Sequence, residues 1–194
     1  MLKKLIFSVF LSIPLFISSQ IISGPMLGYN TMKEVAVWCQ FEKEGDYLLE
    51  FKKENELIQI QEYASEENAN TIHFILKDLL PGTTYSYLIK AQDAQAVLAK
   101  GSFTTQKLWQ YREDPPNFKF AIGSCTYFND AAYDRPGEPY GKGDAIFSSI
   151  LKQQPEAMLW LGDNIYLRES DWTSRSGIRY RYTHYKSQKA LQEL

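Results

Sequence analysis

Between residues 35 and 104 the chain consists of short segments in which apolar and polar residues alternate, separated by turn residues. In the segment "VAVWCQF", residues 35–41, Val35, Val37, Cys39 and Phe41 share one face of an extended strand. Comparable segments recur about every 8 to 12 residues, which is typical of an antiparallel β-sandwich. The segments that follow are "DYLLEFKK", "LIQIQEYA", "TIHFILKDL", "TTYSYLIKAQD" and "LAKGSFTTQ". The sequence therefore predicts an all-β sandwich over residues 20–106.

The stretch "LLPGTTYSY" carries the most specific sandwich signal. Pro81 and Gly82 favour a turn, and the hydroxyl of Tyr85 or Tyr87 can bond back to it, as in the tyrosine corner of immunoglobulin-like domains. On this stretch, residues 20–106 resemble a fibronectin type III or immunoglobulin-like domain.

Residues 107–117 break the alternating pattern. Asp114, Pro115 and Pro116 form a stiff, polar segment that cannot join a β-ladder, so it predicts a linker and a domain boundary. The formal net charge of −2 argues against a nucleic-acid-binding protein, which needs clustered lysines and arginines.

Residues 118–194 are predicted to be α/β, with a strand–helix–strand unit at their start. Strands are expected at 118–122 and 157–161, and the second is a continuous apolar run typical of a parallel sheet buried on both faces. Between them, Asp144 is expected to cap a helix over 145–153 whose apolar side chains form one face. A polar-rich helix is expected over 176–194, to the end of the chain.

The ends of the two predicted strands carry the residues that could do chemistry. A right-handed crossover makes the strands parallel, so Cys125 and Asp163 would emerge at one sheet edge, where adjacent strands lie about 4.8 Å apart. Tyr166 would join them if the segment after Asp163 forms a helical turn. Thiolate, carboxylate and phenolate suit a highly charged metal ion, and Asp163 could bridge a second one. The alternatives are an ordinary turn at Asp163, a packing role for Tyr166 and an inert or separately reactive thiol at Cys125.

The remaining polar candidates have weaker signals. Asn164 and Arg135 are candidates for the rim of a substrate site. His73 is expected on the exposed side of a sandwich strand and His184 in solvent on the last helix. Among the other cations, Lys142, Arg168 and Arg175 could meet a phosphate, although scattered cations are usually surface charge.

The N-terminus reads as an export signal over residues 1–19. Lys3 and Lys4 precede an apolar run that is too short to span a bilayer, and small residues follow it. An uncleaved membrane anchor is the alternative. The sequence predicts export by the general secretory route to the periplasm, the cell surface or the medium, with membrane contact only through this signal. A disulfide between Cys39 and Cys125 is not expected, because the two residues belong to different predicted domains.

Several segments together resemble the secreted alkaline phosphatase D (PhoD-like) family of metallophosphoesterases. They are "SGPMLGYNT", "FAIGSCTYFND", "YDRPGEPYG", "MLWLGDNIYLRESDW" and "YRYTHYKSQKALQEL". The resemblance implies that Cys125, Asp163 and Tyr166 are metal ligands. It implies iron(III) on the cysteinate and tyrosinate, a bridging aspartate, and calcium ions that complete the site. It also implies hydrolysis of phosphate monoesters and diesters, by a protein expected to be monomeric.

The family pattern continues into a Trp-Asp-Asp-His stretch and further ligands that this sequence does not contain. We therefore expect residues 118–194 to be the opening part of a metallophosphatase domain, and the 194-residue chain to be inactive by itself. The alternative is an extracellular sandwich that acts as a binding module, with a vestigial phosphatase tail.

Overall fold

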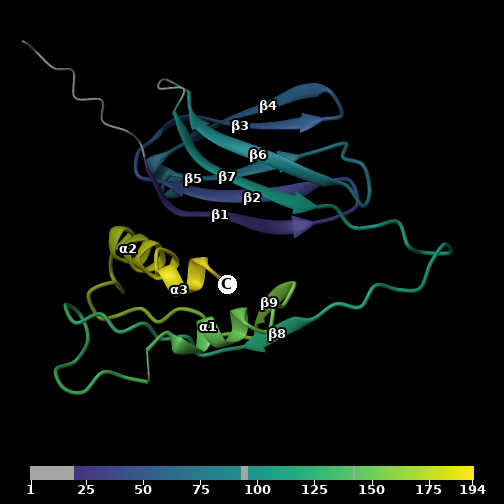
Figure 1. Cartoon of the computed structure of the whole chain (residues 1–194). Helices are drawn as coiled ribbons and strands as arrows, with labels where there is room; N and C mark the ends of the chain where they lie inside the picture. Colours follow the sequence, from purple (N-terminus) through teal and green to yellow (C-terminus); the bar gives the residue numbers. More distant parts are fainter. Residues whose placement is uncertain (1–19, 93–95, 142) are drawn as a thin grey trace, which may run out of the picture.

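A computed structural model describes residues 20–92, 96–141 and 143–194, and its elements lie in two regions (Figure 1). The predicted signal segment lies outside the described residues. Seven strands form the first region: β1 Ile21–Asn30, β2 Val35–Phe41, β3 Gly45–Lys53, β4 Glu56–Ala64, β5 Thr71–Leu76, β6 Thr84–Ala91 and β7 Val97–Thr104, with a short 3₁₀ helix at Glu66–Asn68. The second region contains β8 Phe120–Gly123, α1 Ala145–Leu151, β9 Ala157–Trp160, α2 Arg175–Lys186 and α3 Lys189–Gln192.

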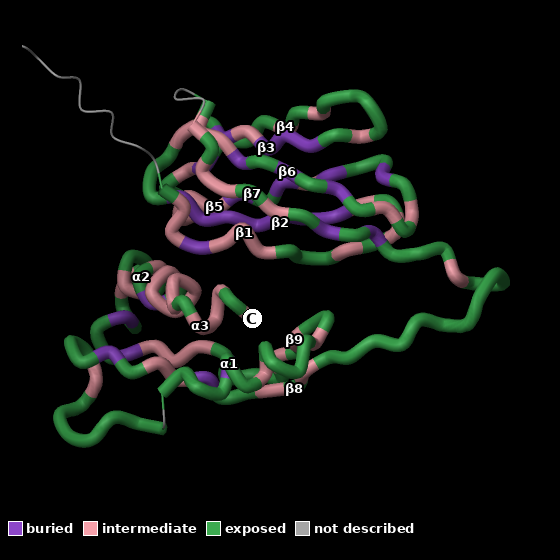
Figure 2. The backbone as a smooth tube through the Cα atoms, in the orientation of Figure 1, coloured by how far each residue is buried: buried purple, intermediate pink, exposed green. Residues whose placement is uncertain are grey.

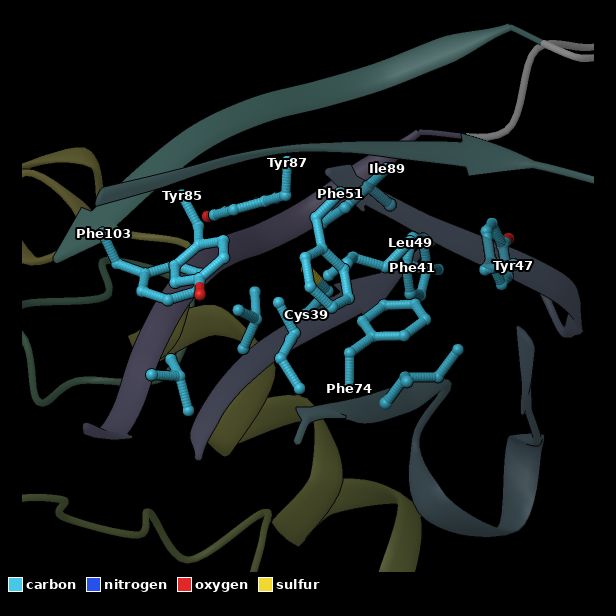
Figure 3. Packing of buried hydrophobic residues seen from close by; sticks show 14 of the residues in the cluster. Cys39, Phe41, Tyr47, Leu49, Phe51, Phe74, Tyr85, Tyr87, Ile89 and Phe103 are labelled. Atoms are coloured by element: carbon cyan, nitrogen blue, oxygen red, sulfur yellow. The ribbon is translucent and has the colours of Figure 1, made fainter. Parts of the chain in front are cut away.

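The predicted β-sandwich is confirmed. One sheet has the order β1-β2-β5 and the other the order β4-β3-β6-β7, and all of their neighbouring strands are antiparallel. The alternating residues of β2 face the other sheet as expected, with Val35, Val37, Cys39 and Phe41 fully buried in the core. Figure 3 shows Cys39 and Phe41 among the packed side chains. The division of the chain into the domains named above stays a prediction.

Strand β1 was missed by the sequence analysis, because its pairing with β2 is interrupted by several register shifts that disturb the alternation. Gly24 lies at one of these irregularities with φ of +95°, and a Cβ there would come within 2.7 Å of the Trp38 carbonyl oxygen. Only a residue without a side chain fits so close to the neighbouring strand.

The tyrosine corner is also confirmed, and the structure identifies its tyrosine as Tyr85. The backbone N–H of Leu80 donates to the Tyr85 hydroxyl at 2.9 Å, while the ring lies in the core against Phe51 and Phe103. Tyr87 is buried further along the same strand.

The last two helices pack on the outer face of the β1-β2-β5 sheet (Figure 1). The Ser23 hydroxyl donates to the Lys186 carbonyl at 2.8 Å, and the Gln40 amide donates to the Thr183 hydroxyl at 2.9 Å. The Lys186 ammonium lies 4.2 Å from the centre of the Trp38 ring. Every residue of β2 is therefore buried, because the core covers one face of the strand and the helical region covers the other (Figure 2).

Three expectations for the predicted α/β region need correction: the burial of the 157–161 strand on both faces, the cap at Asp144 and the unbroken last helix. The 157–161 strand is not buried on both faces, since Leu159 is 52% exposed and β8 is its only partner strand among the described residues. The apolar face of α1 is partly exposed, because Phe147 is buried whereas Ile146 is 59% exposed. Asp144 precedes α1 but makes no side-chain capping hydrogen bond, and the final helix is broken between Lys186 and Lys189.

Candidate metal centre

The strand–helix–strand unit has the predicted parallel pairing. Residues 120–123 of β8 pair in register with residues 157–160 of β9. The pairing extends past the strand ends, because Cys125 N–H donates to the Gly162 carbonyl at 3.3 Å and Thr126 N–H donates to the Asp163 carbonyl at 3.0 Å. The two loops that follow the strands are therefore held side by side, which brings Cys125 and Asp163 to the same edge.

Three predicted ligands meet at this edge. The Tyr166 hydroxyl donates to Asp163 Oδ2 at 3.0 Å, and the Cys125 thiol lies 3.8 Å from the same oxygen. Sequence reasoning expected a helical turn to place Tyr166, but residues 163–168 follow an irregular path. The phenol reaches the carboxylate through that loop, and the hydrogen bond takes the place of the expected i, i+3 helical contact.

The backbone at this edge is in a conformation that ordinary residues rarely adopt. Cys125 has φ of 59° and Asp163 has φ of 47°, both left-handed. Sequence reasoning expected a glycine to make the sharp turn before each ligand. Gly162 does so, with φ of 122°. Gly123 does not, because it is the last residue of β8 and still pairs with β9. Left-handed non-glycine residues cost free energy, and the two candidate ligands at this edge both adopt this conformation.

The phenol of Tyr166 lies beside the Cys125 thiol and the Asp163 carboxylate. Cys125 and Asp163 beside the phenol raise the pKa of Tyr166 above its ordinary value. A metal ion reverses this preference, because its charge stabilises the thiolate and phenolate forms. The donor set of one sulfur and two anionic oxygen groups therefore fits a highly charged metal ion such as the one implied by the family resemblance.

The part of the chain that the structure describes contains no group of three or more histidine, cysteine, aspartate and glutamate side chains placed to hold a metal. The edge brings together one cysteine, one aspartate and one tyrosine. Asn164 is exposed next to Asp163, and Arg135 is exposed with its guanidinium 5.7 Å from the centre of the Tyr140 ring.

Arg168, which sequence reasoning grouped with the possible surface cations, is buried and joins the two loops of the site. Its Nε donates to Asp134 Oδ1 at 2.7 Å, its Nη1 to the Tyr166 carbonyl at 2.5 Å and its Nη2 to the Phe128 carbonyl at 2.8 Å. Its guanidinium also lies 4.1 Å from the centre of the Tyr127 ring. Arg168 therefore fixes the backbone of Tyr166 against the loop that follows Cys125.

A second buried arginine extends this network to α2. Arg181 donates to Asp171 Oδ2 at 2.8 Å and to Asp130 Oδ2 at 3.0 Å. The backbone N–H of Arg168 donates to Asp171 Oδ2 as well, at 2.8 Å. Burial alone would raise the pKa of the Asp171 carboxyl, but the hydrogen bond from Arg181 and the nearby positive charges lower it overall.

Sequence reasoning missed the network, although the spacing of Arg168 and Asp171 in "YLRESDW" offered a local signal for one of its hydrogen bonds. The structure also corrects the expectation for His184, which stacks on Tyr180 and lies 3.8 Å from Asp130 instead of standing free in solvent. His73 is exposed on β5 as expected, Arg175 is exposed at the start of α2, and Lys142 lies outside the described residues.

Comparisons with known proteins show a fold resemblance without a sequence family. No protein-family model and no curated protein sequence matches the chain. Among solved structures it is similar to the structure of PhoD, with a TM-score of 0.66 and 18% sequence identity. The match covers 93% of this chain and 38% of that chain.

Smaller matches fall on β-sandwich proteins. A redesigned β-sandwich protein matches 43% of this chain and 92% of its own, at 22% identity and a TM-score of 0.35. The fibronectin type-III domain of human fibronectin type III domain containing protein 3 matches 49% of this chain and 92% of its own, at 17% identity and a TM-score of 0.33. The likeness to PhoD alone bears on the fold of the whole chain, and the chain spans about 38% of the length of the PhoD structure.

Proposed function

We propose that this chain is an exported member of a metal-dependent phosphoesterase class and that Cys125, Asp163 and Tyr166 form one wall of its metal site. The observation that carries the proposal is the meeting of the three side chains around Asp163 Oδ2, within 3.0 Å for Tyr166 and 3.8 Å for Cys125. The PhoD-like fold over 93% of the chain supports the same reading.

In this proposal the three side chains hold iron(III), with calcium as a further ion near Asp163. When bound, the metal ions would polarise the phosphoryl oxygens and lower the pKa of a coordinated water. Asp163 would supply a carboxylate with two oxygens, so that one residue can contact two ions. Arg168 would keep the Tyr166 loop in place, and Asn164 and Arg135 would lie toward the substrate.

In this proposal the protein is exported, so its substrate lies outside the cytoplasm. The export signal is inferred from the N-terminal segment, which lies outside the described residues. Within the described residues, no helix is long and apolar enough to cross a membrane. The binding-module alternative has less support, because α2 and α3 cover the outer face of one of the two sandwich sheets.

Iron binding by the 194-residue chain tests the assignment directly. A tyrosinate bound to iron(III) absorbs visible light, so titration with iron(III) should produce a visible band. Tyr166→Phe should remove the tyrosinate contribution to this band, and Asp163→Asn should weaken the binding of iron. Tyr63→Phe is the matched control, because Tyr63 is 55% exposed on β4 of the sandwich. A full-strength band in Tyr166→Phe would refute the ligand set.

Hydrolysis of p-nitrophenyl phosphate is the functional readout. Because the described residues bring together only a small set of ligands, we expect slow or undetectable turnover by the 194-residue chain, and the metal titration is the more sensitive measurement. Any hydrolysis that is seen should fall in Asp163→Asn in parallel with the affinity for iron. Hydrolysis that persists in this variant would show that the activity lies elsewhere.

A further inference from the structure

A cavity of about 390 Å³ opens beside the candidate metal centre. Its lining includes Cys125 and Tyr166 of the candidate site and three more tyrosines, Tyr127, Tyr133 and Tyr140. A phosphate ester held at Cys125 and Tyr166 would therefore have aromatic rings close to its ester group.

The aromatic walls are held in place before any ligand arrives. The Asn129 side chain and the Tyr140 backbone exchange two hydrogen bonds, of 2.7 and 2.8 Å, which close the loop between them. Tyr127 packs edge-on against Tyr140, with ring centres 5.4 Å apart, and its hydroxyl donates to Asp134 at 2.7 Å. A preformed aromatic wall loses little conformational entropy when a flat ligand binds to it.

Tyr140 nevertheless keeps much of its surface open, with 45% of it exposed. Closing a loop around a half-exposed ring stabilises that ring without burying it. Aromatic side chains presented in this way are typical stacking platforms for flat rings.

The charges that line the cavity balance one another. Asp134 and Arg168 are paired with each other at 2.7 Å. Arg135 and Glu169 are the other charged lining residues, and their charges are opposite. The lining as a whole therefore carries no net formal charge, although the Arg135 guanidinium lies 5.7 Å from the centre of the Tyr140 ring.

We infer that this cavity binds the aromatic ring of an aryl or arylalkyl phosphate ester, with Tyr140 as the principal stacking residue. The inference rests on the proposed function for the position of the phosphate. The ring site itself depends only on the tyrosines and on the closed loop.

Two pairs of probes separate the ring site from the phosphate site in the full chain. The first pair is phenylphosphonate and cyclohexylphosphonate, and the second is the uncharged pair benzyl alcohol and cyclohexylmethanol. Dissociation constants come from titrations followed by the NMR shift of the Tyr140 amide. We expect each aromatic probe to bind about tenfold more tightly than its saturated partner, a ratio typical of stacking on one aromatic residue.

Variants of Tyr140 give the residue-level test. Tyr140→Phe keeps a ring and should keep the aromatic preference, whereas Tyr140→Leu should abolish it in both pairs. Tyr63→Leu on the sandwich is the control and should change neither ratio. Equal affinities for the aromatic and the saturated probe in both pairs would overturn the inference. If the two probes of each pair also bound tightly, the cavity would be assigned to saturated rings such as sugars.

Asp163→Asn distinguishes this inference from the proposed function. If the aromatic preference stands and Asp163→Asn leaves the phosphonate affinities of the iron-loaded chain unchanged, the ring site is supported and the metal assignment fails. If Asp163→Asn weakens the phosphonates while neither pair shows an aromatic preference, the metal assignment is supported and the ring site fails.

Discussion

Arg168 Nη1 donates a hydrogen bond to the backbone carbonyl of Tyr166 at 2.5 Å, and this contact ties a candidate metal ligand to a buried ion pair. The same guanidinium pairs with Asp134 in the loop that follows Cys125. The two loops of the site therefore share one buried arginine, and their positions depend on each other.

Replacing this arginine should loosen the site. Arg168→Met leaves Asp134 buried without its partner, and breaking a buried pair typically costs about 3–5 kcal/mol. Urea unfolding should show the lower free energy of unfolding. Hydrogen exchange should show that the loss of protection lies between residues 126 and 171. Arg112→Met, in the exposed linker, is the control and should match the unchanged protein.

A double variant shows whether the cost comes from the orphaned charge. Arg168→Met combined with Asp134→Asn removes both charges and should be less destabilised than Arg168→Met alone. If the double variant is as unstable as the sum of the single variants, the two residues do not interact as the structure indicates.

The Arg181–Asp171 contact predicts a stability loss in acid. The pKa of Asp171 is lowered in the folded protein, so its stabilising contribution is complete above the unfolded value of about 3.9. It is lost as the pH falls below that value and through the folded pKa. The difference in unfolding free energy between the unchanged protein and Asp171→Asn should therefore shrink below about pH 4. The unfolding free energy of Asp114→Asn, the control, should change with pH as that of the unchanged protein does. If the difference between Asp171→Asn and the unchanged protein stays constant with pH, the prediction is contradicted.

The two cysteines should differ sharply in reactivity. Both are free. Cys39 is fully buried in the sandwich core (Figure 3), and burial raises its pKa to about 12, whereas Cys125 is exposed. The thiolate is the reactive form, so a thiol reagent at pH 8 should label one cysteine in the native protein and two after unfolding. Native Cys125→Ser should not be labelled, while native Cys39→Ser should react like the unchanged protein. Equal labelling rates for both thiols would disprove the burial of Cys39.

The tyrosine corner should stabilise the sandwich through a single hydroxyl. Tyr85→Phe keeps the ring contacts with Phe51 and Phe103 but removes the acceptor of the Leu80 N–H. The expected cost is about 1 kcal/mol, measured by urea unfolding with hydrogen exchange of the β2 and β6 amides as the probe of the sandwich. Tyr63→Phe, an exposed tyrosine on β4, should cost nothing, and an equal effect of the two substitutions would mean that the corner contributes nothing specific.

The sandwich could be predicted well because its signals are local. In β2 each second residue points to the core, and the turn before β6 has the residues that such a turn requires. Strand β1 escaped prediction, because its register shifts and the close approach at Gly24 are set by the neighbouring strand and leave no regular pattern.

By itself, the sequence determined the strands of the sandwich other than β1, the parallel unit of β8 and β9, and the placement of Cys125 and Asp163 at one edge of it. Strand ends and crossover handedness follow from local composition and chain geometry, which a sequence contains. Tertiary structure decided the rest: the buried roles of Arg168 and Arg181, the path that brings Tyr166 to Asp163, and the cover that α2 gives to β2. These features depend on residues far apart in the chain meeting in a place of low solvent exposure, and no local pattern records which partners will meet there.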